Sequence, residues 1–139
     1  MLLLDTHTWI WTVEGNARRI GRQARRWLSR AQSDGSIHVS PVTCFEITAL
    51  HAAGRLRLAR SPEQWIRDAL DAPGVRVTEL TVDVALDAGS IPRTALADAL
   101  DRLLVATARQ LDVTFLTSDA RILTYAASTG AVRVRNASH

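Results

Sequence analysis

Residues 98–119 read DALDRLLVATARQLDVTFLTSD, and this stretch decides the fold. Its first part repeats apolar residues with a helical period and predicts a long helix over Ala97–Leu111. A short apolar run, Val113–Leu116, follows almost at once and ends in the polar residues Thr117, Ser118 and Asp119. A long helix followed by a short buried strand with a polar end is typical of the repeating unit of an α/β sheet.

The same alternation of strand and helix patterns runs along the rest of the chain. The expected strands are Leu2–Leu4, Ser36–Val39, Val75–Leu80, Val113–Leu116 and Val132–Val134. The expected helices are Thr8–Val13, Ala17–Gln32, Pro41–Ala53, Pro62–Leu70, Val84–Ala88, Ala97–Leu111 and Arg121–Ala127. Strands interleaved with helices predict an α/β fold, a three-layer sandwich in which helices flank a mostly parallel central sheet.

Length and composition are those of one globular domain. The chain has 139 residues, of which 47% are hydrophobic, and no linker or repeat interrupts it, so we expect a single domain over residues 1–139. No run approaches the length of a membrane span, and the first residues do not form a secretory signal. Cys44 is the only cysteine, so we expect no internal disulfide, a cytoplasmic location and a small buried side chain there.

Every one of the 17 basic residues is an arginine, because the sequence contains no lysine. This excludes a Walker-type phosphate loop and a pyridoxal-phosphate enzyme, which need a lysine, and no glycine-rich dinucleotide motif is present. The formal net charge is only +3. If five of the 14 acidic residues held a metal ion, the other nine would face 17 arginines, and this excess favours a polyanionic partner.

Carboxylates follow two of the expected strands. Asp5 comes directly after the first strand and Asp119 after Val113–Leu116, so both lie at the carboxyl edge of a parallel sheet, where ligands bind in such folds. Asp98 and Asp101 are three residues apart and share one face of their helix. Each has a structural alternative: Asp5, Asp98 and Asp119 are in positions to cap helices, and Asp101 to interact with a helix dipole.

Capping does not explain Glu46, which lies in mid-helix in an apolar stretch. An unpaired carboxylate is costly to bury there, and a metal ion would remove that cost and allow several like charges to share one pocket. An all-oxygen ligand set suits Mg²⁺, with Mn²⁺ as a substitute. Zinc is not favoured, because no ligand spacing connects the four histidines, which are His7, His38, His51 and His139.

Four segments together carry a family resemblance: LLLDTH at 2–7, SPVTCFEI at 40–47, DALDRLLVATA at 98–108 and FLTSD at 115–119. In this order and spacing, they resemble the PIN-domain nucleases, most of all the VapC-type toxins of bacterial toxin–antitoxin pairs. The resemblance covers nearly the whole chain and includes GRLRL at 54–58 and Tyr125. Where relatives often have Asp-Pro-Phe-Asp-Arg, this chain has Asp-Ala-Leu-Asp-Arg, and Leu50 stands where many have a lysine.

The resemblance implies which residues do the chemistry. The metal-binding and catalytic quartet would be Asp5, Glu46, Asp101 and Asp119, with Asp98 as an accessory metal ligand. The activity would be that of a magnesium-dependent endoribonuclease in which metal-activated water hydrolyses the RNA phosphodiester. The implied partners are RNA, a cognate antitoxin protein and a second copy of the chain in a homodimer.

Residues outside the quartet are assigned to the substrate. Thr117 and Ser118 lie beside the acidic edge, and Arg22, Arg25 and Arg26 on the second helix could follow RNA phosphates, although a solvated helix face also explains these arginines. We expect Trp9 and Trp11 to pack rather than to stack on bases.

Two other functions share some of these features. A phosphotransfer receiver or phosphatase also places an aspartate after its first strand, but such proteins need a lysine, which is missing here. The other alternative is a catalytically silent PIN-like module that binds RNA or protein. The complete quartet favours activity.

Overall fold

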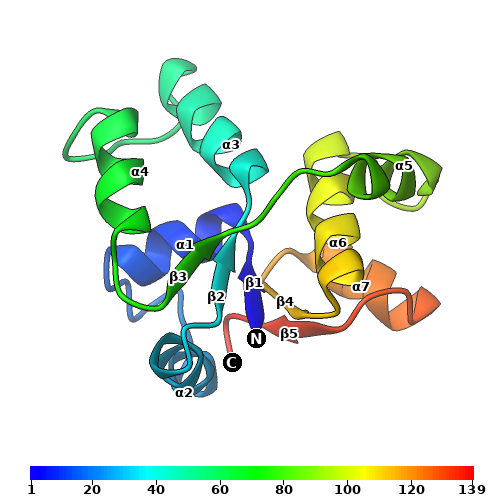
Figure 1. Cartoon of the computed structure of the whole chain (residues 1–139), viewed down its shortest axis with the longest axis horizontal. Helices are drawn as coiled ribbons and strands as arrows, with labels where there is room; N and C mark the ends of the chain where they lie inside the picture. Colours follow the sequence, from blue (N-terminus) through cyan, green and yellow to red (C-terminus); the bar gives the residue numbers. More distant parts are fainter.

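A computed structural model of the chain describes residues 1–139 and contains one five-stranded sheet (Figure 1). Its strands are β1 (Leu2–Leu4), β2 (Ile37–Val39), β3 (Val75–Val77), β4 (Thr114–Thr117) and β5 (Val134–Asn136). They lie in the order β3-β2-β1-β4-β5, and every neighbouring pair is parallel. In the central strand, Leu3 is level with both His38 and Phe115. The predicted α/β fold is therefore confirmed, with a wholly parallel sheet.

Seven helices surround the sheet. They are α1 (Thr6–Val13), α2 (Arg22–Ser33), α3 (Pro41–Ala52), α4 (Pro62–Leu70), α5 (Val82–Ser90), α6 (Ala99–Leu111) and α7 (Ala120–Thr129). Alternate residues of β1 contribute to two separate cores, because successive strand side chains point to opposite faces. Leu2 and Leu4 join an apolar cluster with residues of α1, α2 and α4, whereas Leu3 joins a cluster with residues of α6 and α7.

The predicted start of the second helix was wrong by five residues. We expected a helix from Ala17, but residues 17–20 form a turn and α2 begins at Arg22, after Gly21. The reason is a tertiary contact: the backbone at Gly21 is extended and passes so close to the chain end that a Cβ there would lie 2.1 Å from the carbonyl oxygen of His139. The amide of Gly21 also donates to the carbonyl of Ala137 (2.9 Å).

Other helices and strands begin or end a few residues away from their predicted bounds. Helix α1 begins at Thr6 rather than Thr8, because the Asp5 side chain accepts from the Thr6 amide. Strand β3 ends at Val77 instead of Leu80, since it is an edge strand with Val77 52% exposed. Seven further elements keep their predicted position but differ at one or both ends by one or two residues, namely α3, α5, α6, α7, β2, β4 and β5.

Gly74 lies in the turn between α4 and β3, where the backbone passes close to the end of α2. It has φ +82°, and an added Cβ would lie 2.3 Å from the Gln32 carbonyl oxygen. Gly54 has a similar φ of +72° but open space around it. We predict that Gly54→Ala lowers the free energy of unfolding by about 1 kcal/mol through backbone strain alone. Gly74→Ala should lower the free energy of unfolding by about 1–3 kcal/mol more than Gly54→Ala, because the backbone at Gln32 or at residue 74 must move to make room for the methyl group.

Urea unfolding of the two variants measures this difference. Equal losses would show that the α4–β3 turn does not press on α2, and would contradict the close approach of these two segments.

Candidate functional site

Asp5 lies at the carboxyl end of the central strand and caps the helix that follows. Its Oδ1 accepts from the Thr6 amide (2.8 Å), and its Oδ2 accepts from the Thr117 hydroxyl (2.6 Å), 112 residues away in sequence. Burial raises the pKa of Asp5, the two hydrogen bonds lower it, and the nearby charges of Glu46 and Asp119 raise it again. The net effect is a raised pKa, so this carboxylate is held where its charge is poorly solvated.

Glu46 comes to the same place from α3. It is partly buried, and its Oε1 accepts from the Thr6 hydroxyl (2.5 Å), which also lies 3.1 Å from the Thr43 hydroxyl. From the sequence we expected a metal ion to offset the cost of burying Glu46, and this stays a prediction; the structure adds a threonine hydroxyl that offsets part of it. Glu46 has a hydrogen-bond donor, and the neighbouring Phe45 is 62% exposed, so α3 is not enclosed on that side.

Asp119 caps α7, as its position after β4 allows. Its Oδ1 accepts from the amides of Arg121 (2.8 Å) and Ile122 (3.2 Å). Its own amide donates to the Thr117 hydroxyl (3.0 Å), the same hydroxyl that donates to Asp5. We expected Thr117 to contact substrate, but it is fully buried and both of these bonds occupy its hydroxyl, so it positions the two carboxylates instead. Ser118 is partly buried, and its substrate contact stays a prediction.

Asp98 and Asp101 start α6. Asp98 is exposed and accepts from the Leu100 amide (2.8 Å), which makes it the N-cap. Asp101, in the first turn, is partly buried, and its pKa is raised to about 7. Burial is the largest cause, followed by the negative charges of Asp98, Asp5, Asp119 and Glu46, in that order.

These five carboxylates therefore form one electrostatic cluster, which we call the acidic site: Asp5, Glu46, Asp98, Asp101 and Asp119. No arginine is among the groups that shift the pKa of Asp5 or Asp101. The donors are all oxygens, a chemistry that fits a hard divalent cation and would relieve the repulsion. No group of three or more side chains is close enough to enclose an ion as the carboxylates stand, so they are near enough to repel but are not arranged as a closed ligand shell.

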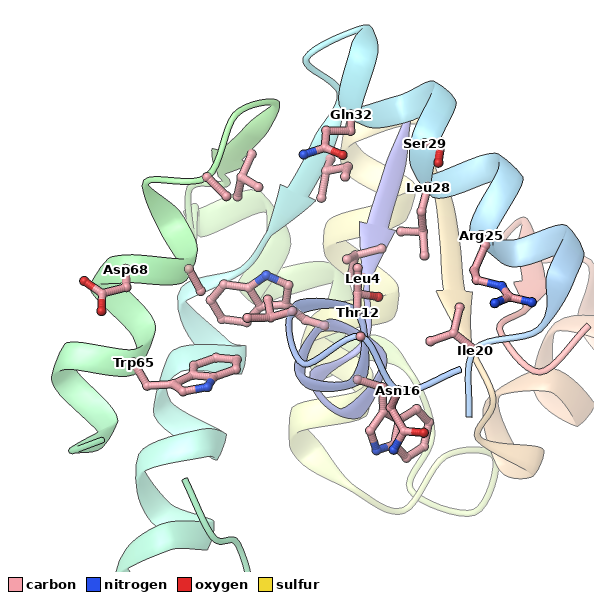
Figure 2. A pocket seen from close by; sticks show the side chains of 18 of the residues that line it. Leu4, Thr12, Asn16, Ile20, Arg25, Leu28, Ser29, Gln32, Trp65 and Asp68 are labelled. Carbon is pink, nitrogen blue, oxygen red and sulfur yellow. The ribbon is translucent and has the colours of Figure 1, made fainter. Parts of the chain in front are cut away.

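The α2 arginines lie away from this cluster. Arg22, Arg25 and Arg26 are all exposed on α2. Arg25 lines a cavity of about 650 Å³ between α1, α2 and α4, where Leu4, Leu28 and Trp65 supply apolar walls (Figure 2). The contact of these arginines with RNA stays a prediction.

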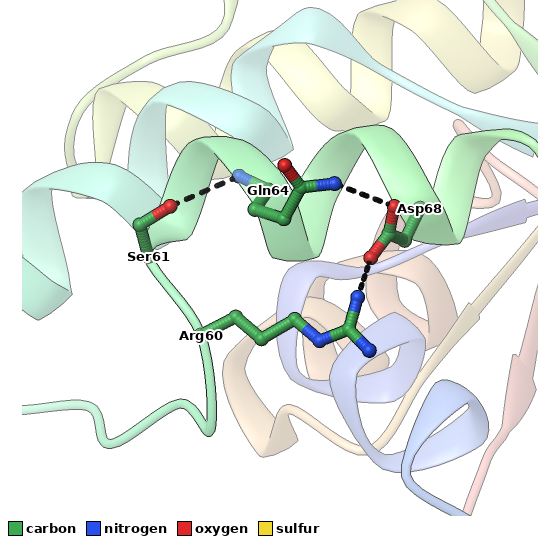
Figure 3. Close-up of polar contacts among 4 residues, drawn as sticks. All are labelled: Arg60, Ser61, Gln64 and Asp68. Carbon is green, nitrogen blue, oxygen red and sulfur yellow. Dashed lines mark hydrogen bonds and ion pairs between the residues drawn. The ribbon is translucent and has the colours of Figure 1, made fainter.

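The cavity has a polar edge on the α4 side. Arg60 pairs with Asp68 there, and the Gln64 amide donates to the other oxygen of Asp68 (2.8 Å; Figure 3). Both members of the ion pair line the cavity. The pair is largely exposed, so it orders the surface of α4 more than it stabilises the fold.

The tryptophans pack, as we predicted. Trp9 is 1% exposed and meets the Trp65 ring edge-on, with 5.3 Å between the ring centroids. Trp11 is partly buried, and the Arg19 guanidinium lies 5.2 Å from its ring centroid. Cys44, expected to be buried, is only partly so, and burial raises the pKa of its thiol.

Two hydroxyls of the acidic site were missed from the sequence, those of Thr6 and Thr43. The sequence contains a signal for each of these two residues. Thr6 follows Asp5 at the strand-to-helix junction, and Thr43 stands three residues before Glu46, on the same face of α3. Both side chains are buried, so these hydroxyls orient Glu46 and do not face solvent.

Comparison with known proteins places the chain in a family. The family model for the PIN domain matches residues 2–127. Ribonuclease VapC22 of Mycobacterium tuberculosis (strain ATCC 25618 / H37Rv) is 28% identical over 121 residues, which cover 87% of this chain and 88% of the relative.

Solved structures share the fold. The chain is similar to a chain in the crystal structure of VapBC2 from Rickettsia felis bound to a DNA fragment from their promoter, with TM-score 0.69, 12% identity and 97% of both chains covered. It is also similar to a chain of FitAcB from Neisseria gonorrhoeae, with TM-score 0.63, 24% identity, and 98% of this chain and 97% of that one covered. At these identities the likeness concerns the fold alone.

The pKa of Asp101 predicts how the metal-free protein responds to pH. An aspartate with pKa about 7 in the folded state and an ordinary value of 3.8 when unfolded keeps its proton longer in the folded protein. Stability from this group is therefore greatest at low pH and is lost as the pH rises through about 7. Asp101→Asn should raise the free energy of unfolding in EDTA by on the order of 1 kcal/mol at pH above 7, and hardly at all near pH 4.

Thermal melts in EDTA across this pH range test it, with Asp98→Asn as the matched control. Asparagine keeps the N-cap at residue 98, so that variant should show a smaller gain. Excess magnesium should stabilise wild type more than Asp101→Asn. A lower melt of Asp101→Asn in EDTA, or equal magnesium effects, would mean that Asp101 is not in a repulsive metal pocket.

Proposed function

The chain belongs to the PIN domain family, and from that premise we propose that it is a magnesium-dependent endoribonuclease, the toxin of a toxin–antitoxin pair. The observation that carries the proposal is the convergence of five carboxylates at one edge of the sheet, where three of them start helices and their charges, after burial, raise the pKa of Asp101. A protein gains no stability from gathering like charges, so such a cluster indicates function. The resemblance to Ribonuclease VapC22 supports RNA as the substrate.

Asp5, Glu46, Asp101 and Asp119 would hold the cation, with Asp98 as an accessory ligand. When bound, Mg²⁺ supplies a nucleophilic hydroxide near neutral pH and neutralises charge on the phosphate. The carboxylates need not act as bases, and Mn²⁺ could replace Mg²⁺ because its ligand preference is similar.

The chain's own groups would keep these ligands oriented. Thr117 fixes Asp5 from one side, the Thr6 amide fixes it from the other, and the Thr6 hydroxyl holds Glu46. Asp119 is held by two amides at the start of α7. Three of the four carboxylates of the quartet are thus held at helix starts or by buried threonines, so these three would lose little side-chain entropy when a cation binds.

Other parts of the proposal concern the cell and the partners. No helix of the chain is long and apolar enough to span a membrane. We place the protein in the cytoplasm as a single PIN domain over residues 1–139 that forms a homodimer. A cognate antitoxin is proposed because the structural neighbours include a toxin–antitoxin complex from Klebsiella pneumoniae. A catalytically silent PIN-like module that binds RNA or protein is the second candidate.

Cleavage of RNA should require a divalent cation. We predict that purified protein cleaves total RNA in magnesium or manganese and loses this activity in EDTA. Asp101→Asn should reduce kcat/KM by two or more orders of magnitude, because it removes a core ligand. Asp98→Asn should reduce kcat/KM less, because the main role of Asp98 is to cap α6 and asparagine can also form this cap.

Sequencing of the cleavage ends gives the site in the same experiment. Undiminished cleavage under chelation would overturn the metal role, whereas folded protein with no cleavage in any metal would favour the silent module. A larger loss in Asp98→Asn than in Asp101→Asn would reverse the assignment of the two aspartates.

A neighbouring small open reading frame should encode an antitoxin that binds over the acidic site. We predict that its product co-purifies with this protein and inhibits cleavage. Co-expression and pull-down, followed by the RNA assay, measure both properties. A neighbour that neither binds nor inhibits would count against the toxin assignment while leaving the ribonuclease proposal intact.

A further inference from the structure

A trough lined by five polar and three apolar residues lies along one face of α7, the helix that Asp119 of the acidic site caps. It has a volume of about 500 Å³. Its α7 wall consists of residues at helical spacing, and its other wall belongs to the connection between α5 and α6. Its polar lining residues are Thr94, Arg121, Thr124, Ser128 and Thr129, and Tyr125 lies among them.

One wall of the trough begins next to a carboxylate of the acidic site. On α7, Arg121 donates its amide to Asp119, so the trough starts two residues after this carboxylate. On the other wall, Thr94 precedes Asp98 by four residues. The α7 wall of the trough therefore starts beside Asp119, one of the carboxylates proposed to hold the cation.

Buried apolar side chains join the two walls of the trough. Ile91 and Leu96, from the α5–α6 connection, belong to the same apolar cluster as Ile122 and Tyr125 of α7. All four are at least 92% buried. The trough is thus a built feature of the fold and not a gap between loose segments.

Most of its polar groups are free to bind a ligand. Arg121 makes no ion pair, and the side chains of Thr94 and Thr124 make no hydrogen bond within the protein. The hydroxyls of Ser128 and Thr129 donate to the Tyr125 carbonyl; the Thr129 oxygen also accepts from the Ala131 amide (3.1 Å), whereas the Ser128 oxygen can still accept from a ligand. One guanidinium with several hydroxyls suits a chain of alternating phosphates and sugars, since guanidinium binds phosphate and hydroxyls pair with a ribose 2′-hydroxyl.

We propose that this trough binds the single-stranded RNA next to the cleavage site, with a backbone phosphate on Arg121 and ribose hydroxyls on Thr94 and Thr124. This inference rests on the proposed ribonuclease function. It predicts that the substrate strand runs along α7. It also gives the RNA a path that does not involve the arginines of α2.

Binding of labelled single-stranded RNA of mixed sequence tests the path in EDTA at low salt, where no cleavage follows. Arg121→Gln should weaken binding several-fold and reduce the slope of log affinity against log salt by about 0.7, the value for one lost phosphate contact. The matched control is Arg57→Gln, an exposed arginine without an ion pair in the connection between α3 and α4, on the opposite side of Figure 1 from α7. It should change neither.

A second variant tests the hydroxyls. Thr94→Val with Thr124→Val keeps the side-chain shape and removes both hydroxyls. It should reduce the affinity for RNA several-fold while leaving the affinity for DNA of the same sequence unchanged. Thermal melts confirm that each variant is folded, and both threonines are exposed, so the fold does not depend on them.

The outcomes separate this inference from the proposed function. Equal losses in Arg121→Gln and Arg57→Gln, or no loss in either, would overturn the trough, as would wild-type protein that binds no RNA. Cleavage that is abolished by Asp101→Asn but has an unchanged kcat/KM in Arg121→Gln would reject the trough and keep the ribonuclease. RNA bound through Arg121 without cleavage in any metal would keep the trough and reject the ribonuclease.

Discussion

The carboxylate of Asp5 stands where the central strand turns directly into a helix, with no loop between them. Burial and the neighbouring charges disfavour its ionised form, and hydrogen bonds from the Thr6 amide and the Thr117 hydroxyl offset part of that cost. Thr117 ends β4, and its buried hydroxyl donates to the Asp5 carboxylate after β1 and accepts from the Asp119 amide. This one hydroxyl therefore connects β1 with β4 and fixes Asp5 relative to Asp119. The arrangement of the acidic site follows from this junction.

The same groups that start the helices also make the site. Asp5, Asp98 and Asp119 are N-caps, so the backbone amides of α1, α6 and α7 hold them in fixed positions. The structural and functional interpretations of these aspartates are therefore compatible. Asp101 differs, because it caps nothing and its pKa is raised to about 7 by burial and by four neighbouring negative charges, so stability and chemistry conflict at this residue.

The architecture and the acidic residues could be predicted because they leave local patterns. Apolar runs such as Leu2–Leu4 identify strands, and their ends identify the edge where ligands bind. The extended turn at Gly21 and the bond between Thr117 and Asp5 could not, because each depends on residues more than 100 positions away. Glu46 shows the same limit, since its donor is a threonine on another helix and no pattern in α3 reveals it.

The four tryptophans all belong to one side of the sheet. Trp9 and Trp65 are in the core formed with α1, α2 and α4, and Trp11 and Trp27 pack against it. The only tyrosine, Tyr125, is in the core on the other side. Intrinsic tryptophan fluorescence therefore reports on just one of the two cores, and the half that contains α6 and α7 could loosen without changing the signal. Only agreement with circular dichroism would establish that both halves unfold as one unit.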